Sequence, residues 1–362
     1  MNILLSYSSG PLITIVPPIP ESQYSQSQIP QSESFRPRFR KPTYSSNMNK
    51  KRILVVGGTG YLGQHLLQSF ANLQGSSSYD LAFTYCSTPP SDLLHALPQS
   101  HFPLDLRIGD GFDFITDTFG QPDVVVNCAA LSVPRACEAD PLAAMCINVP
   151  KSLVSWISSF KEKETLLIHL STDQVYEGTK SYYKEEDKTL PVNIYGRSKV
   201  AAEEFINSHC SNFAILRSSI IYGPQTVSPV LKSLPIQWID DILSKGNNVD
   251  FFFDEFRSPV FVNDVVRVII ALTKKWVIDG TPMQLLLNLG GPDRVSRAQM
   301  AEVVAEIRGY DTSLINHVSA SSVDRGVRSP ADISMDISKL VNTLNIAPIS
   351  FKDGVTLTLL TH

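Results

Sequence analysis

The stretch that most restricts the fold is "RILVVGGTGYLGQHLLQSF", residues 52–70, in which aliphatic residues run directly into glycines. The run from Ile53 to Val56 predicts a strand buried on both faces, as in parallel sheets. After the glycines, apolar residues recur at helical spacing and predict a helix with one buried side. A strand, a glycine turn and a helix at the start of an α/β domain are typical of dinucleotide binding.

The glycines stand three residues apart, and each position has a physical use. Gly57 permits a tight turn, Gly60 lets the backbone approach a pyrophosphate, and Gly63 allows the helix to pack close to the strand. The start of the helix then offers free N–H groups to anionic oxygens. The alternative is a glycine-rich turn that binds nothing. The cofactor residues predicted in this loop are Gly57, Thr59, Gly60, Tyr61, Leu62 and Gly63.

Strand patterns alternate with helix patterns as far as about residue 224, which predicts a Rossmann-type, doubly wound parallel sheet. Beyond Pro224 the alternation weakens, and a smaller C-terminal lobe is expected to close over the sheet. We expect a dinucleotide-binding domain at residues 50–225. Residues 226–362 are expected to form mainly a substrate-binding lobe, with some segments returning to the sheet.

Residues 1–49 differ from the rest because they are rich in Ser, Gln and Pro and lack a periodic apolar pattern. Such a segment cannot bury enough apolar surface to offset its ordering entropy, so we expect a disordered tail. Its few acids and its basic cluster weakly resemble an organelle transit peptide. The alternatives are a plain tail, or an upstream start with Met48 as the usual initiator.

Charge and composition exclude several classes of function. The net charge of −4 gives no electrostatic footprint for nucleic acid or an anionic membrane, and no apolar run reaches the roughly 20 residues that span a bilayer. The five cysteines include no C-x-x-C pair and the histidines lack ligand spacing, so we expect no metal. A cytoplasmic location is the simplest prediction, with organelle targeting by the tail as the alternative.

A candidate catalytic pair lies in "NIYGRSKVAAEE", which begins at Asn193. Positions i and i+4 place Tyr195 and Lys199 on one helix face. Reduction of a ketone needs an acid for the developing alkoxide, and a nearby ammonium lowers the pKa of a tyrosine. "LLIHLST" predicts a strand that ends at Ser171 and Thr172, where parallel sheets bind ligands. The alternative is an exposed helix after an ordinary strand.

Longer motifs give the chain a family resemblance. They are "STDQVYEGTKSYYKEEDKTLPVNIYGRSKVAAEE", "PDVVVNCAALSVPRACEADP", "AILRSSIIYG", "FRSPVFVNDV" and "VRSPADISMDISKL". Together with the glycine loop they resemble the extended short-chain dehydrogenase/reductase superfamily, and within it the dTDP-4-dehydrorhamnose reductases. Val56 stands where the common family loop has threonine. The resemblance covers most of residues 52–345.

The resemblance implies roles for individual residues. Thr172 would be the catalytic hydroxyl, Ser171 its helper, Tyr195 the acid, and Lys199 both its tuning cation and a ligand of the nicotinamide ribose. The remaining cofactor positions that it implies are Asp105 with Leu106 at the adenine, and Ala129, Ala130 and Leu131 at the centre of the cofactor.

The cofactor preference is predicted from the end of the second strand, "TYCSTPP". It carries no acid for a ribose 2′-hydroxyl, which leaves room for a 2′-phosphate with Ser87 and Thr88 as donors. The sequence shows no arginine nearby. NADP(H) is therefore favoured and NAD(H) stays open.

Function stays open between an enzyme and a partner protein. The chain also resembles the regulatory β subunit of methionine adenosyltransferase, which would make the catalytic subunit its partner. An epimerase would use the same triad, whereas the dehydratases carry "STDEVYG" and this chain has Gln174 in place of the glutamate. For a nucleotide-sugar substrate, Arg257 and Arg328 fit positions near the diphosphate, and Glu138 fits either a substrate position or a helix cap. A homodimer is compatible with this resemblance.

Overall fold

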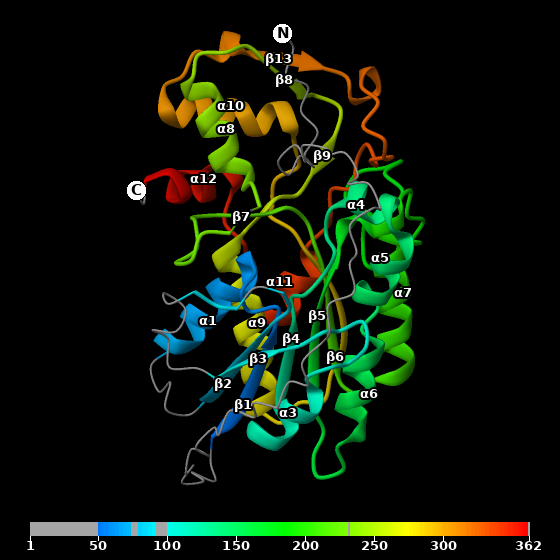
Figure 1. Ribbon diagram of the computed structural model, residues 1–362. Helices are drawn as coiled ribbons and strands as arrows, with labels where there is room; N and C mark the ends of the chain where they lie inside the picture. The colour runs from blue at the N-terminus through cyan, green and yellow to red at the C-terminus, as the bar shows by residue number, and fades with distance from the viewer. Residues whose placement is uncertain (1–49, 74–78, 88, 92–99, 231, 361–362) are drawn as a thin grey trace, which may run out of the picture.

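The computed structural model describes residues 50–73, 79–87, 89–91, 100–230 and 232–360 (Figure 1). The tail at residues 1–49, for which the sequence predicts disorder, lies outside these ranges. Among the helices within them, none combines the length and the apolar character that crossing a bilayer requires.

A seven-stranded parallel sheet forms the centre of the molecule. Its order is β11-β6-β5-β4-β1-β2-β3, so the chain starts in the middle and builds outward in both directions. The direction of building reverses between β1 and β4, which leaves a crevice at their carboxyl ends where such folds bind ligands. The strands are β1 (Lys51–Val56), β2 (Tyr79–Tyr85), β3 (Ser100–Pro103), β4 (Val124–Asn127), β5 (Leu166–Thr172), β6 (Phe213–Ser218) and β11 (Gln284–Leu289).

Helices cover both faces of this sheet (Figure 1). Because side chains alternate along a strand, Ile53 and Val55 pack in the layer of α1, α9 and α11, whereas Leu54 and Val56 pack in the layer of α3, α6 and α7. The predicted doubly wound sheet is therefore confirmed. The helices around it are α1 (Tyr61–Asn72), α3 (Phe112–Thr118), α4 (Pro134–Ala139), α5 (Pro141–Asn148), α6 (Lys151–Ser159), α7 (Ile194–His209), α9 (Val262–Val277) and α11 (Ser338–Leu344).

A smaller lobe with its own apolar core lies beyond the carboxyl ends of the strands (Figure 1). Ser296 is the N-cap of α10 and forms a reciprocal capping box with Gln299. In contrast, α9, β11 and α11 also follow residue 225 but join the layers of the central sheet. The other elements are η2 (Asp173–Val175), β7 (Ile221–Tyr222), α8 (Pro235–Ser244), β8 (Val249–Phe252), β9 (Phe256–Arg257), β10 (Val260–Phe261), β12 (Val295–Ser296), α10 (Arg297–Arg308), η3 (Thr312–Leu314), β13 (Ile315–Val318), η4 (Ala320–Ser322) and α12 (Phe351–Leu360).

Candidate active site

The glycine loop joins the end of β1 to the start of α1. Gly57 has a positive φ of 80°, a conformation that favours glycine. Gly60 is the N-cap of α1 and contributes no side-chain cap, so the first helical N–H groups can reach an anion. Gly63 approaches the loop so closely that a Cβ there would lie 2.4 Å from the Gly57 carbonyl oxygen. This narrow cradle with free backbone donors fits the pyrophosphate of a dinucleotide.

Gly63→Ala is therefore expected to weaken NADPH binding about 10–100-fold, because the added methyl group must displace backbone at a cost of about 1–3 kcal/mol. Titration of nicotinamide fluorescence measures the affinity. Gly280→Ala is the control, because a Cβ added to Gly280 would have no atom within 4 Å, although the positive φ of Gly280 disfavours alanine. The control should lose about 1 kcal/mol of stability and keep its affinity; equal losses of affinity in both variants would contradict the cradle.

The ends of β2 and β3 lie on the side of the crevice where the family resemblance predicts the adenosine. Leu104 N donates to the Tyr85 carbonyl oxygen at 2.9 Å, so the segment with Asp105 and Leu106 follows β3 beside the end of β2. The Asp105 carboxylate accepts from Arg107 Nε at 2.9 Å and from Nη2 at 2.5 Å, and these bonds lower the pKa of Asp105. Asp105, the residue predicted to bind the adenine, is thus already hydrogen-bonded to Arg107 through both carboxylate oxygens.

Arg107 corrects the expectation that no arginine lies near the end of the second strand. It lies within electrostatic range of Cys86, the residue directly before Ser87. Sequence reasoning missed it because Arg107 follows a different strand, and the parallel pairing of β2 with β3 brings the two ends together. Thr88 lies outside the described residues.

The loop after β4 forms the wall beside the glycine loop. Ala129 contacts Gly57 closely, since a Cβ added to Gly57 would lie 3.0 Å from the Ala129 backbone. Leu131 exchanges two hydrogen bonds with the buried amide of Asn148, at 2.8 and 3.0 Å. Ala130 lines the cavity described below. Asn148 therefore holds the segment at which the cofactor's centre is expected.

A cavity of about 530 Å³ lies between the sheet and the smaller lobe, and Thr172, Tyr195 and Lys199 all line it. That volume suits a small-molecule ligand. Asn193 caps α7 by accepting from Gly196 N at 2.9 Å, which places Tyr195 in the first turn of the helix. Tyr195 and Thr172 line the same cavity, and their side chains are hydrogen-bonded to each other. The strand end and the helix predicted from the sequence therefore meet.

The electrostatics of this pair differ from the expectation. Burial raises the pKa of Tyr195 far above its usual 10, and the hydrogen bond to Thr172 offsets this in part. The Lys199 ammonium does not turn to Tyr195; its Nζ donates to the Leu170 carbonyl oxygen at 2.7 Å. Burial lowers the pKa of Lys199 to about 8. In this arrangement the lysine does not tune the tyrosine.

Ser171 also departs from its expected role as a helper at the carbonyl. Its Oγ donates at 2.5 Å to Oε1 of Glu203, a buried residue on α7. Glu203 in turn forms an ion pair with Arg217 of β6 at 2.7 Å, with both side chains buried. Sequence analysis missed both residues. The available signal was an arginine inside the otherwise apolar strand "FAILRS", because a buried charge needs a partner.

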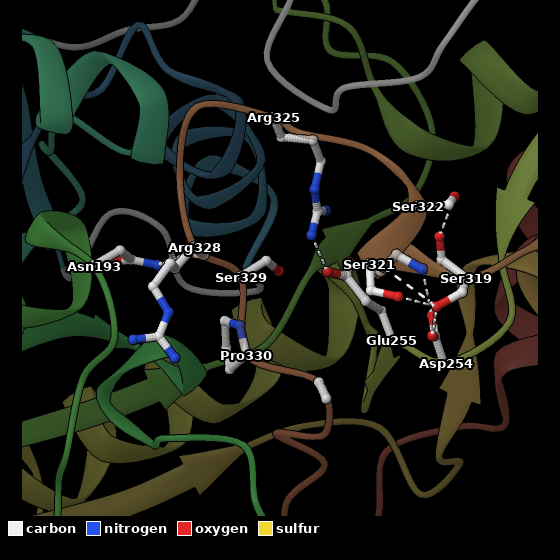
Figure 2. Close-up of polar contacts among 12 residues, drawn as sticks. Asn193, Asp254, Glu255, Ser319, Ser321, Ser322, Arg325, Arg328, Ser329 and Pro330 are labelled. Atoms are coloured by element: carbon white, nitrogen blue, oxygen red, sulfur yellow. Dashed lines mark hydrogen bonds and ion pairs between the residues drawn. The ribbon is translucent and has the colours of Figure 1, made fainter.

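One side of the cavity is bounded by a segment that we call the strap, residues 323–331 (Figure 2). Arg257, predicted to bind a diphosphate, is buried and holds the strap by donating to Ser329 Oγ at 3.0 Å and to the carbonyl oxygen of Pro330 at 2.9 Å. Arg328 is exposed and lines the cavity, and its side chain points away from Arg325 (Figure 2). Arg328 is thus better placed than Arg257 to reach a ligand.

Glu138 lies away from the main cavity, behind the strap, where it lines a second, polar hollow. Its Oε1 accepts from Ile194 N at 2.8 Å, at the start of α7. Of the two roles left open by the sequence, the structure shows the helix-capping contact.

Two further arginines, Arg297 and Arg325, line the cavity around the buried Glu255, and the sequence did not single them out. Arg325 Nη2 lies 2.5 Å from Glu255 Oε1 (Figure 2). Burial by itself would raise the pKa of Glu255, but the hydrogen bond from Arg325 and the charges of Arg257 and Arg297 outweigh it and hold the pKa low. This end of the cavity carries an excess of positive charge. Among the described residues, no three His, Cys, Asp or Glu side chains gather as metal ligands.

Comparison with known proteins identifies the family of this chain. Residues 51–361 match the family model of the RmlD substrate binding domain. The chain belongs to this family. The match confirms the family resemblance stated from the motifs, and it covers both the central sheet and the smaller lobe.

Individual relatives of this RmlD-family chain fall into two groups. It is 29% identical to a "probable low-salt glycan biosynthesis reductase" of Haloferax volcanii, over 64% of this chain and 75% of the relative. It is 28% identical to the methionine adenosyltransferase 2 subunit beta of Mus musculus, over 85% and 87% respectively. The fold is that of dTDP-4-dehydrorhamnose reductase from Bacillus anthracis in complex with NADP, with a TM-score of 0.70, 19% identity, and coverage of 86% of this chain and all of that one.

Proposed function

We propose that this chain is an NADP(H)-preferring reductase of a 4-keto nucleotide sugar, with Tyr195 as the general acid. The observation that carries the proposal is the meeting of Tyr195, Thr172 and Lys199 in one cavity beside the glycine loop. Family membership and the reductase among the relatives support it.

In the proposed mechanism, the glycine loop would hold NADPH, whose chemistry is the supply of a hydride to the carbonyl carbon. The carbonyl π bond breaks, and the oxygen takes the proton of the Tyr195 hydroxyl. The Tyr195 hydroxyl is protonated at neutral pH and so holds the proton that it must give, although burial raises its pKa and makes it a weaker acid than a free tyrosine. Thr172 is hydrogen-bonded to Tyr195, and its hydroxyl would donate to the same substrate oxygen and stabilise the developing charge.

The charged side chains at the two ends of the site support the proposed cofactor and substrate class. Residues 86–91 after β2 contain no acid, and Arg107, although paired with Asp105, lies within electrostatic range of Cys86, which supports NADP(H). At the other end of the cavity, Arg297, Arg325 and Arg328 supply the positive charge that suits a nucleotide diphosphate. Arg257 holds the strap that carries Arg325 and Arg328.

A second candidate function is a cofactor-bound regulatory subunit of methionine adenosyltransferase. The β subunits of that enzyme align over 80–85% of this chain, which favours this alternative. A regulatory subunit can keep an inherited cofactor site without turnover.

One two-part experiment on the full chain separates the candidates. NADPH and NADH binding are measured by nicotinamide fluorescence, and NADPH oxidation is then followed at 340 nm with dTDP-4-dehydrorhamnose and related keto sugars. Binding with turnover is the expected result. Tight binding without turnover on any keto sugar would sink the reductase proposal, and co-purification with a methionine adenosyltransferase catalytic subunit would then support the second candidate.

A further inference from the structure

Below the candidate active site lies a buried ion pair that the proposed mechanism does not use. The Glu203 carboxylate accepts from Arg217 Nε at 3.1 and 3.2 Å and from Nη2 at 2.7 Å. Their side chains are 8% and 5% exposed. Removing two charges from water costs about as much as their attraction returns, so burial of the pair is weak evidence for a stabilising role. Its place in the molecule suggests another role.

Glu203 joins the two elements that carry the candidate catalytic groups. It lies on α7, four residues after Lys199, so both side chains are on one helix face. Its Oε1 also accepts from Ser171, and Ser171 directly precedes Thr172 at the end of β5. Lys199 donates to Leu170 on the same strand. Two adjacent hydrogen bonds therefore tie the end of β5 to α7, and one of them ends on Glu203.

Four titratable groups face Lys199 from the surrounding elements: Glu203 on its own helix, His169 on β5, Cys128 after β4 and Cys137 on α4. Burial raises the pKa of Cys128 to about 12 and that of Cys137 to about 11, so both thiols are neutral at pH 7. Burial holds the pKa of His169 well below its usual value, so its ring is neutral too. The acidic group that Lys199 faces is therefore Glu203, the partner of Arg217 in the buried ion pair.

We propose that Glu203 is a positioning residue for the reductase site, which fixes Ser171 at the end of β5 and supplies the negative charge that the buried Lys199 faces. Burial lowers the pKa of Lys199 to about 8, and Glu203 opposes that shift more than any other group. The inference rests on the proposed function, because it assigns a role within the same site. Arg217 on β6 holds the Glu203 carboxylate in place by donating to both of its oxygens.

Glu203→Gln tests the proposal through the pH dependence of cofactor binding. Lys199 is expected to bind the nicotinamide ribose as an ammonium, so wild-type affinity should fall as pH rises through about 8. Without the charge of Glu203, that midpoint should move down by at least about one pH unit. NADPH and NADH are both titrated from pH 6 to 10, because the 2′-phosphate has its own pKa near 6. Glu203→Asp should return the midpoint toward that of the wild type.

The matched control is Glu204→Gln, the same change at the exposed neighbour, which should leave the midpoint unchanged. Equal loss of affinity at every pH in Glu203→Gln would mark a merely structural role and overturn the proposal. If Glu203→Gln does not fold, Glu203→Gln with Arg217→Gln removes both charges, and an unchanged midpoint there is equally decisive.

Failure of the reductase proposal gives a different result. If the cofactor binds but no keto sugar is turned over, the pH dependence of cofactor affinity can still be measured. If neither cofactor binds, the unfolding temperature is measured against pH instead. This temperature should rise with pH as Lys199 loses its proton, and the rise should begin at a lower pH in Glu203→Gln than in the wild type. The same starting pH in both proteins would refute the inference.

Discussion

Tyr195→Phe is expected to lower the turnover of dTDP-4-dehydrorhamnose by about 100-fold or more while NADPH affinity stays nearly unchanged. The change removes the hydroxyl that would give its proton to the substrate oxygen. The ring is kept, so the packing of this buried side chain against Cys137 and Ala144 should persist. Turnover is followed at 340 nm and affinity by nicotinamide fluorescence.

The Tyr195→Phe variant should still fold, so loss of the fold would not explain its lower turnover. Thr172 keeps its contacts to Asp173 Oδ1 and Gln174 N, both at 3.2 Å, so the loss of one hydrogen bond should cost about 1 kcal/mol. Tyr182→Phe, at an exposed tyrosine, is the control and should match the wild type. Wild-type turnover in Tyr195→Phe would rule out Tyr195 as the acid.

Lys199→Met is expected to reduce both turnover and cofactor affinity, in contrast to Tyr195→Phe. Loss of a charged donor to the ribose should cost about 1.5–3 kcal/mol, which is roughly 10–150-fold in affinity. Separate measurement of affinity and turnover distinguishes the two variants. Unchanged affinity would remove Lys199 from the cofactor site.

The same variant should change how stability depends on pH. In the folded protein the pKa of Lys199 is about 8, below its ordinary value of 10.5. Between these values the unfolded chain binds more protons than the folded one, so this group makes the free energy of unfolding rise with pH across that window. In Lys199→Met that contribution is absent. The unfolding temperature of the wild type, relative to the variant, should therefore increase between pH 8 and 10.5, and a constant difference would contradict the lowered pKa.

Much of the fold could be predicted because its signals are local. The run from Ile53 to Val56, the glycines after it and the capping box of Ser296 each depend on residues a few positions apart. The same is true of Tyr195 and Lys199, whose spacing places them on one face whatever surrounds the helix. This candidate pair was therefore recognisable before its geometry was known, whereas Thr172 was added by the family resemblance.

The partners of these residues were not recognisable, because they come from distant segments. Ser171 lies 32 residues from Glu203, and Arg257 lies 72 residues from Ser329. A motif gives the type of side chain but not the direction of its hydrogen bonds. Hence the expected helper Ser171 donates to a carboxylate, and the expected ligand Arg257 instead holds the strap.

The sequence by itself determined the doubly wound sheet, the glycine loop and the shared helix face of Tyr195 and Lys199, because short-range periodicity and spacing encode them. Only the tertiary structure decided the electrostatics of the site. Burial, which depends on the whole fold, raises the pKa of Tyr195 and lowers that of Lys199. Strand pairing likewise placed Arg107 beside the end of β2, and the packing of α7 against β5 and β6 placed Glu203 between Ser171 and Arg217.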